Sequence, residues 1–204
     1  MPLTIEPTPL ALAITGASGA PYALRLLEVL LSKGEAVDLM ISAPGQIVLG
    51  MEAGLKLPGR PAEIGRALTR HFGSHQGQLR VFGKEEWTAP LASGSSVPRA
   101  MVVCPCTMGT LASIASGLSG NLIDRAADVV IKEGRKLVLV PRETPYSAIH
   151  LENMLKLARL GVVILPPNPG FYTQPSSVPD LVDFVVSRIL DQLAIENDLS
   201  PRWG

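Results

Sequence analysis

The sequence has few aromatic residues, few cysteines and no net charge. Aromatic residues make up 4% of the 204 residues, two residues are cysteines, and the 18 basic side chains equal the 18 acidic ones. A chain without net charge lacks the basic footprint of a nucleic-acid-binding or membrane-surface protein. With 47% hydrophobic and only 18% charged residues it is too apolar to be disordered. Its length favours one domain with an aliphatic core, interrupted by 19 glycines and 18 prolines.

The cysteines and histidines predict neither a disulfide nor a metal site. Cys104 and Cys106 lie one residue apart, a spacing that is geometrically poor for a disulfide. No further thiol is present to complete a zinc site. Metal-ligand spacing is also missing from the three histidines, which we interpret as packed or solvated: His71, His75 and His150.

No segment has the features of a membrane span or a leader. The longest uncharged run, 100–123, is broken by a proline and three glycines, and the run 161–179 contains five prolines. Met1–Pro9 lacks the basic stretch of a signal peptide and contains Glu6. A cytoplasmic protein is the simplest interpretation.

Short aliphatic runs alternate with amphipathic patterns along the chain. Strands are predicted at 10–15, 37–41, 79–82, 100–104, 137–140 and 162–165. Helices are predicted from Pro21 to before Gly34, after 42–45, at 62–72, after 110, from about 120 to 133, at 147–160 and at 179–195. The stretch 84–98 is predicted to be a long, partly ordered loop. This alternation predicts an α/β doubly wound domain, a mostly parallel sheet with helices on both faces.

A doubly wound sheet binds its ligand outside the carboxyl ends of the strands, where the strand order reverses. The loops that follow strands are therefore the places to look for a site. They are predicted at 15–20, 42–52, 104–110, 141–146 and 166–176.

Two of these loops lead from a strand into a helix and offer small or hydroxylated residues. The first, 15–19, reads Thr-Gly-Ala-Ser-Gly and could cradle a phosphate at the helix N-terminus. It lacks the third glycine of a dinucleotide fingerprint, because Tyr22 stands there, which favours a mononucleotide over NAD. The second loop carries the hydroxyls of Thr107 and Thr110. A plain tight turn and an ordinary capped helix remain the alternatives.

Charged side chains mark the later loops. Arg142 and Glu143 lie between two prolines, where the arginine could hold a phosphate and the glutamate could move a proton, although a surface ion pair is the simpler alternative. Arg188 shares a helical stripe with Leu181 and Phe184, which predicts a guanidinium on or near the buried face unless it extends to solvent.

Five segments, taken in order, closely resemble the UbiX-type flavin prenyltransferases. They cover nearly the whole chain: 12–20, 105–117, 121–129, 141–145 and 166–172. The resemblance implies a Rossmann-like flavoprotein fold and a metal-independent enzyme. It also implies that the dimethylallyl group of dimethylallyl monophosphate is joined to N5 of reduced FMN, with ring closure at C6. The prenylated FMN would serve UbiD-type decarboxylases and so connect the chain to ubiquinone biosynthesis.

The resemblance also implies functional residues. The positions that match the family's FMN contacts are Gly16, Ala17, Ser18, Ser42, Thr107, Met108, Gly109, Thr110 and Arg142. The positions expected around the prenyl phosphate are Arg125, Lys132, Arg142, Glu143, Tyr172, Arg188 and Trp203. Catalytic roles are expected for Ser18, Glu52, Lys132 and Glu143.

These roles agree with the chemistry that an allylic phosphate requires. Lys132, Arg142 and Arg188 could form a local cationic cluster that stabilises the departing phosphate. Glu143 could exchange a proton with that phosphate, and Ser18 could relay a proton near N5. The resemblance further implies a homo-oligomer, a dodecamer, with the single domain 1–204 ending in a tail at 196–204 that packs on a neighbouring subunit.

Two alternatives remain open. Flavin-dependent cysteine decarboxylases have a related fold, but by resemblance they would need a catalytic histidine where this chain has 46–52 and no histidine. A non-catalytic flavin-binding protein would keep the glycine and threonine loops but would not need Glu143 and Arg188 together.

Overall fold

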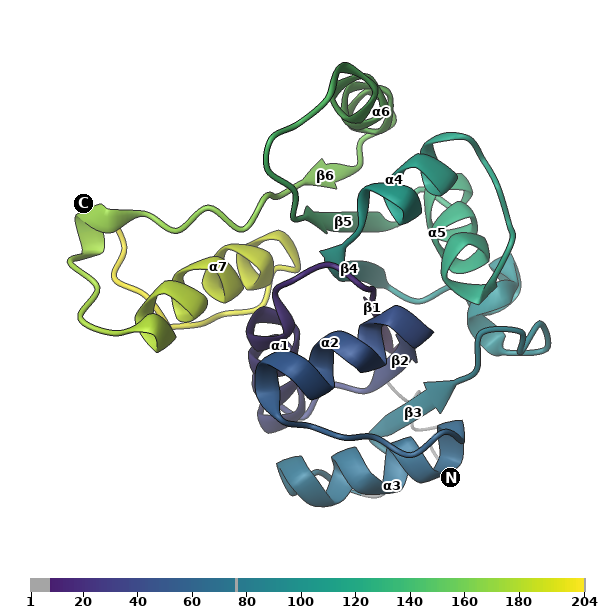
Figure 1. Cartoon of the computed structure of the whole chain (residues 1–204). Coiled ribbons are helices and arrows are strands. Elements are labelled where there is room, and N and C mark those ends of the chain that lie inside the picture. The colour runs from purple at the N-terminus through teal and green to yellow at the C-terminus, as the bar shows by residue number, and fades with distance from the viewer. Residues whose placement is uncertain (1–7, 76, 204) are drawn as a thin grey trace, which may run out of the picture.

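The computed structural model describes residues 8–75 and 77–203, which fold around one six-stranded sheet (Figure 1). Residues 1–7, which carry most of the segment compared with a leader, lie outside the described residues. The strands are β1 (Leu10–Ile14), β2 (Val37–Ile41), β3 (Leu79–Phe82), β4 (Ala100–Cys106), β5 (Lys136–Pro141) and β6 (Val163–Ile164). The helices are α1 (Ala20–Ser32), α2 (Ala43–Ala53), α3 (Pro61–Phe72), α4 (Met108–Ala115), α5 (Leu122–Lys132), α6 (Ala148–Arg159) and α7 (Val178–Gln192).

The sheet is parallel throughout and its strand order is β3-β2-β1-β4-β5-β6. The chain builds outward from β1 to β3, returns to β4 beside β1, and then builds outward in the other direction. The order therefore reverses between β1 and β4. That switch point is where a doubly wound sheet opens a crevice at the carboxyl ends of its strands.

Helices cover both faces of the sheet because the strands alternate between two apolar cores. In β1, Leu10, Leu12 and Ile14 point to the core beneath α1, α2, α3 and α7. Ala11 and Ala13 point to the other core, beneath α4, α5 and α6. Burial on both faces explains why β1 is a continuous apolar run without polar alternation.

The structure confirms the predicted fold class and the predicted strands and helices. Strand β4 extends beyond its predicted end to Cys106, and β6 keeps only two residues. The stretch 84–98, predicted as a loop, contains two 3₁₀ turns at Pro90–Ala92 and Gly94–Ser96. Within the described part of the chain, no helix is long and apolar enough to cross a membrane.

The C-terminal part of the chain forms an arm beside the sheet. Helix α7, the segment before it and the chain end lie together on the left of Figure 1. The tail folds back on its own helix, because Arg202 donates a hydrogen bond of 2.8 Å to Asp191 of α7. The predicted contact between this tail and a neighbouring subunit stays a prediction.

Candidate active site

The loops that follow β1 and β4 are joined by one buried threonine. The Thr15 hydroxyl donates to the Pro105 carbonyl at 2.7 Å and accepts from the Thr107 N–H at 2.9 Å. Thr15 is 2% exposed, so these bonds are shielded from competing water. One side chain therefore holds the two loops at the switch point in a fixed register.

Two glycines let the loop after β1 approach the start of α2. A Cβ atom on Gly16 would lie 2.3 Å from the Cβ of Pro44, and one on Gly45 would lie 2.6 Å from the Ile14 carbonyl oxygen. The Ser42 hydroxyl caps α2 by accepting from the Gly45 N–H at 3.0 Å. Any side chain at either glycine would push the β1 loop and the α2 N-terminus apart.

The start of α4 presents backbone N–H groups that bond to no residue in the described part of the chain. Thr107 Oγ1 caps the helix by accepting from the Thr110 N–H at 3.1 Å and donates to Thr110 Oγ1 at 3.0 Å. Among the described residues, none accepts from the N–H groups of Met108 and Gly109. Free N–H groups at a helix N-terminus favour an anion or the polar edge of a ring.

A cavity of about 160 Å³ opens beside these groups. Its lining brings together Ser42, Thr110 and Asn121, and it also includes Phe82 and Lys84 from the end of β3. Phe82, Lys84 and Asn121 were not predicted as site residues. The sequence offered a signal for two of them. Phe82 ends a predicted strand, and Asn121 lies at a predicted helix start, where it caps α5 by accepting from the Ile123 and Asp124 N–H groups.

Glu52 occupies backbone donors at the start of α1, where the loop 15–19 was expected to cradle a phosphate. Its Oε2 accepts from the Gly19 and Ala20 N–H groups at 2.9 Å each. Two donors predicted for a phosphate are therefore taken by a carboxylate of the chain itself. Burial raises the pKa of Glu52, but a hydrogen bond from the Ser18 side chain, these two amides and the Arg142 charge outweigh it, so its pKa is lowered.

The structure brings Ser18, Glu52 and Arg142 together from three different elements. Arg142 follows β5, and its N–H donates to the Cys106 carbonyl at 3.3 Å. Glu143 beside it is half-buried and accepts from the Thr144 N–H at 3.1 Å. A cation, two carboxylates and a hydroxyl thus lie at the carboxyl edge of the sheet, and such groups can hold an anion and exchange a proton.

Lys132 does not belong to this group within one protomer. It ends α5, which runs from the carboxyl edge at Leu122 back to the start of β5, and its Nζ lies beside Gly94 and Glu133. Arg142 follows the far end of the six-residue β5, so about 20 Å of strand separates the two levels. The predicted cluster of Lys132, Arg142 and Arg188 is therefore wrong for a single chain.

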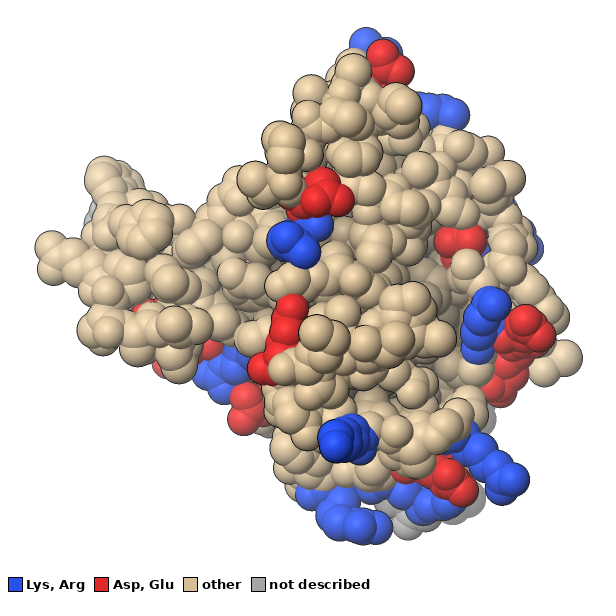
Figure 2. Space-filling model, in the orientation of Figure 1, with Lys and Arg blue, Asp and Glu red and all other residues tan. Residues whose placement is uncertain are grey.

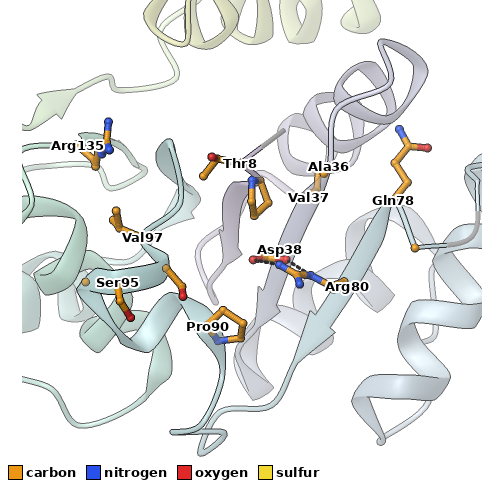
Figure 3. Close-up of a pocket in the computed structure, with 14 residues that line it drawn as sticks. Thr8, Ala36, Val37, Asp38, Gln78, Arg80, Pro90, Ser95, Val97 and Arg135 are labelled. Carbon is orange, nitrogen blue, oxygen red and sulfur yellow. Dashed lines mark hydrogen bonds and ion pairs between the residues drawn. The ribbon is translucent and has the colours of Figure 1, made fainter. Parts of the chain in front are cut away.

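Gly94 also borders a larger pocket of about 710 Å³ at the amino edge of the sheet (Figure 3). There, buried Asp38 of β2 and Arg80 of β3 form an ion pair with N–O distances of 2.7 and 2.8 Å. The pocket lies at the edge opposite the loops that hold Thr15 and Thr107, so it is separate from the candidate site.

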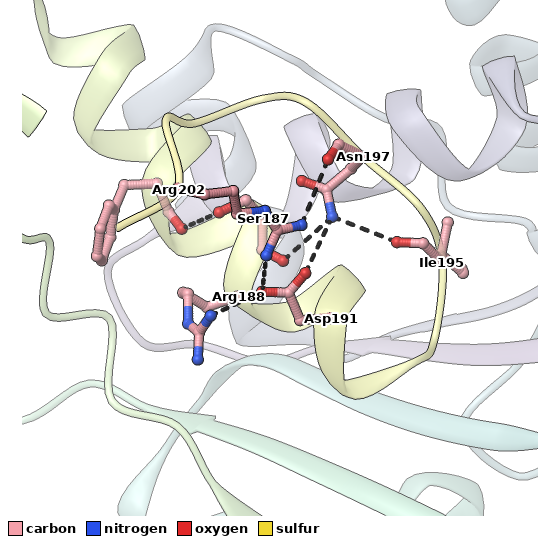
Figure 4. Close-up of polar contacts among 7 residues, drawn as sticks. Ser187, Arg188, Asp191, Ile195, Asn197 and Arg202 are labelled. Carbon is pink, nitrogen blue, oxygen red and sulfur yellow. Dashed lines mark hydrogen bonds and ion pairs between the residues drawn. The ribbon is translucent and has the colours of Figure 1, made fainter. Parts of the chain in front are cut away.

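Arg188 is exposed rather than buried. Its side chain is 54% exposed and donates to Asp191 at 2.8 Å, and Asp191 also holds Arg202 (Figure 4). The buried stripe of α7 contains Val185 and Ile189 instead. Phe184 of the predicted stripe packs partly buried against the core, whereas Arg188 extends to solvent, which is the alternative that the sequence left open.

Tyr172 and Trp203 lie against each other on the arm. Their rings meet edge to face with centroids 4.9 Å apart, and Tyr172 meets Phe184 in the same way at 5.8 Å. Phe184 is one turn before Arg188 on α7. Three of the residues expected around a prenyl phosphate therefore share one surface of the arm: Tyr172, Arg188 and Trp203.

Arg125 is directed away from the strand-end loops. Its guanidinium donates to the Ala92 carbonyl at 3.1 Å and to Asp128 at 2.8 Å. Like Lys132, it faces the 3₁₀ turns before β4 and not the loop that carries Arg142.

Comparison with known proteins identifies the family. Residues 3–190 match the family model described as Flavoprotein. The flavin prenyltransferase UbiX of Pseudomonas aeruginosa is 57% identical over 198 residues, which cover 97% of this chain and 95% of the relative. The chain belongs to the UbiX-type flavin prenyltransferase family.

Solved structures of UbiX-type proteins share the whole fold. The AnUbiX complex with FMN and dimethylallyl pyrophosphate has a TM-score of 0.85 and 38% identity, and the match covers 98% of each chain. A dodecameric FMN-dependent UbiX-like decarboxylase from Escherichia coli O157:H7 has a TM-score of 0.83 and 41% identity, and the match covers 96% of this chain and 98% of that chain. The match is therefore with the complete domain and not with one motif.

The residues at the carboxyl edge suit the flavin of a UbiX-type protein. The close approach at Gly16 and Gly45 brings backbone to the crevice, and Ser42, Thr107 and Thr110 supply hydroxyls beside free helix N–H groups. Hydroxyls and N–H groups at helix N-termini are the donors that a mononucleotide phosphate and a polar ring edge require.

Proposed function

We propose that the chain joins the dimethylallyl group of dimethylallyl monophosphate to reduced FMN, first at N5 and then at C6. The observation that carries this proposal is the group formed by Ser18, Glu52 and Arg142 at the carboxyl edge of the sheet, in a chain 57% identical to a flavin prenyltransferase. No metal takes part in the proposed reaction. Reduced FMN, when bound, supplies the electron-rich ring atoms that attack the allylic carbon.

The helix N-termini of α2 and α4 hold the flavin in this proposal. Ser42 and Thr110 face one cavity and Thr107 orients Thr110, so the three hydroxyls bind and orient the ligand. Gly16, Ala17, Met108 and Gly109 contribute backbone rather than side chains. The FMN phosphate would bind on the α2 and α4 side, because Glu52 already occupies the Gly19 and Ala20 donors at the start of α1.

Ser18 and Glu52 form the proton-handling pair beside the flavin. Glu52 is fixed by two backbone amides, and its lowered pKa keeps it ionised near neutral pH, so it accepts from Ser18. This bond orients the Ser18 hydroxyl for relaying a proton. Glu143, half-buried next to Arg142, exchanges a proton with the departing phosphate while Arg142 stabilises the phosphate's charge.

Residues on a second protomer complete the site. Lys132 and Arg125 face the amino-edge turns of their own chain, so they reach the prenyl phosphate only from a neighbouring copy. Large apolar side chains support such an assembly because they are strongly exposed: Met51 80%, Ile149 68%, Phe171 72%, Val178 69% and Trp203 79%. We propose a homo-oligomer, a dodecamer like the E. coli relative, in which the tail 196–204 packs near a neighbouring site.

The single-domain boundary 1–204, cytoplasmic location and delivery of the product to a UbiD-type decarboxylase are further parts of the proposal. They rest on the family resemblance and on the composition of the chain.

Mass analysis of the flavin tests the activity. Anaerobic incubation of the protein with reduced FMN and dimethylallyl monophosphate should yield a flavin heavier by one dimethylallyl unit. A bound but unmodified flavin would contradict the proposal. The Glu143→Gln variant should bind flavin normally and form product much more slowly, because glutamine cannot exchange the proton.

Subunit mixing tests the shared site. Lys132→Ala and Glu143→Gln homo-oligomers should each be nearly inactive. Oligomers reassembled from both variants should recover activity, because some sites receive an intact Lys132 from one chain and an intact Glu143 from another. Mixed oligomers as inactive as their parents would place both residues in the same chain's site and contradict the arrangement.

A further inference from the structure

The chain is neutral as a whole but strongly basic around α3 and β3. The stretch 53–84 contains one acidic residue, Glu63, and six basic ones: Lys56, Arg60, Arg66, Arg70, Arg80 and Lys84. In the space-filling view, blue side chains outnumber red ones at the lower edge of the molecule, where α3 lies (Figure 2). The stretch 53–84 is separate in the sequence from the loop that carries Arg142 and Glu143.

A groove of about 570 Å³ runs between α3 and β3. Leu79 and Val81 of β3 and Gly65 of α3 line its apolar part, and Arg66 and Arg70 line its basic side. A Cβ atom on Gly65 would lie 3.5 Å from Val81 Cγ2. The absence of a side chain at Gly65 therefore keeps the groove open next to the strand.

Strand β3 is an edge strand, and no described strand pairs with its outer side. The Val37 N–H donates to the Gln78 carbonyl at 2.8 Å, and Val37 is in register with Leu79. In a parallel ladder, alternate residues direct both backbone groups to the same neighbour. The N–H and C=O groups of Leu79 and Val81 consequently point away from β2, and none of the described residues bonds to them.

The cations on the rim are available for a partner. Arg66 and Arg70 are exposed, one turn apart on α3, and have no ion-pair partner among the described residues. Arg80 is different, because its guanidinium is held by Asp38. The two arginines of α3 therefore favour a negatively charged ligand in this groove.

We propose that the groove between α3 and β3 binds an extended acidic segment of a partner protein, which adds to β3 as a further strand. The segment's backbone pairs with the outer N–H and C=O groups of Leu79 and Val81. Its apolar side chains enter the groove beside Gly65, and its carboxylates meet Arg66 and Arg70. A nucleic acid would satisfy the arginines but could not fill the apolar floor or pair with the outer edge of β3.

A short synthetic peptide of alternating valine and glutamate is the probe. It carries a fluorescent label, and its binding to the full-length protein is followed by anisotropy. Hydrogen exchange measures the backbone directly, because the amides of Leu79 and Val81 should exchange more slowly when the peptide is bound. A peptide with N-methylated valines has the same charge but cannot pair with β3, and it should not bind.

Two variants separate the groove from general electrostatics. Arg66→Glu with Arg70→Glu reverses the rim charge and should weaken peptide binding about tenfold or more. Lys156→Glu with Arg159→Glu makes the same change in charge on exposed positions of α6 and should leave peptide binding unchanged. Gly65→Leu keeps the arginines but fills the groove, and it should also weaken binding about tenfold.

Several results would overturn the proposal. They are failure of the valine–glutamate peptide to bind, equal binding by the N-methylated peptide, and unchanged binding by Gly65→Leu. Equal competition by a single-stranded oligonucleotide would assign the groove to polyanions. Loss of the native oligomeric state in the Arg66→Glu/Arg70→Glu variant would assign it to a second copy of this chain. None of these measurements depends on prenyltransferase activity.

Discussion

Replacing Gly16 with alanine should damage flavin binding although alanine adds only one methyl group. The new Cβ would lie 2.3 Å from the Cβ of Pro44, far inside van der Waals contact. Pro44 belongs to α2 and is conformationally stiff. The strain is therefore relieved by moving the loop 15–19 away from the start of α2.

The expected magnitude follows from the cost of overpacking. Restoring an ordinary carbon–carbon contact of about 3.5–4 Å requires a displacement of more than about 1 Å. Inserting one methyl group into a packed region typically costs about 1–3 kcal/mol. Because flavin binding needs Ser42 and the β1 loop at their present spacing, the same free energy should appear as a loss of affinity of about 5- to 150-fold.

Titration of FMN against the protein, followed by quenching of flavin fluorescence, measures this loss. Gly50→Ala is the matched control, because Gly50 also belongs to this region, lies within α2 and has open space around its Cβ position. Alanine there should leave affinity unchanged and slightly stabilise the helix. If Gly16→Ala bound FMN as tightly as the unmodified protein, the crevice between the β1 loop and α2 would not be the flavin site.

Three further predictions concern stability and reactivity. Glu52→Ala removes the acceptor at the start of α1 and should lower the free energy of unfolding by about 0.5–1 kcal/mol. Since the pKa of Glu52 is lowered, the stabilisation by Glu52 is present above about pH 4.5 and should be lost on acidification. Urea titrations at several pH values measure this loss. Arg80→Ala leaves the buried Asp38 unpaired, which should cost about 3 kcal/mol at neutral pH. Burial already raises the pKa of Asp38, so this variant should lose stability as pH rises from 4 to 7, and a flat profile would contradict the assignment. Burial also raises the pKa of Cys104 and Cys106, so rapid alkylation of the native protein would show that the thiols are not buried as described.

Local patterns in the sequence were enough to predict the strands and the loops that follow them. The run that became β1 has no polar residue because both faces of that strand are buried, and burial of this kind is visible without any knowledge of distant contacts. Thr107 and Asn121 were predicted near helix starts because capping depends on residues three positions apart.

Contacts between distant segments were harder to predict. Glu52 reaches the start of α1 across more than thirty residues, and no local pattern indicates that pairing. The sequence left open whether Arg188 lies at the buried face of α7 or extends to solvent, because the stripe of Val185 and Ile189 is equally compatible with the pattern. Deciding between the two stripes required knowing that α7 packs against α1.

Lys132 differs from these cases, because its position followed from topology that the sequence already indicated. A helix that connects two parallel strands runs antiparallel to them, so its last residue lies at the amino edge of the sheet. Lys132 ends such a helix, whereas Glu143 follows the next strand at the carboxyl edge. If both act on one phosphate, as proposed, Lys132 of one protomer enters the site that contains Glu143 of another. The protomer surface around Lys132 and the surface around Glu143 are then two different surfaces. Every protomer must then present both surfaces, and an assembly in which all sites are complete must close on itself by symmetry. The separation of two side chains within one chain is thus a physical reason for this enzyme to be an oligomer.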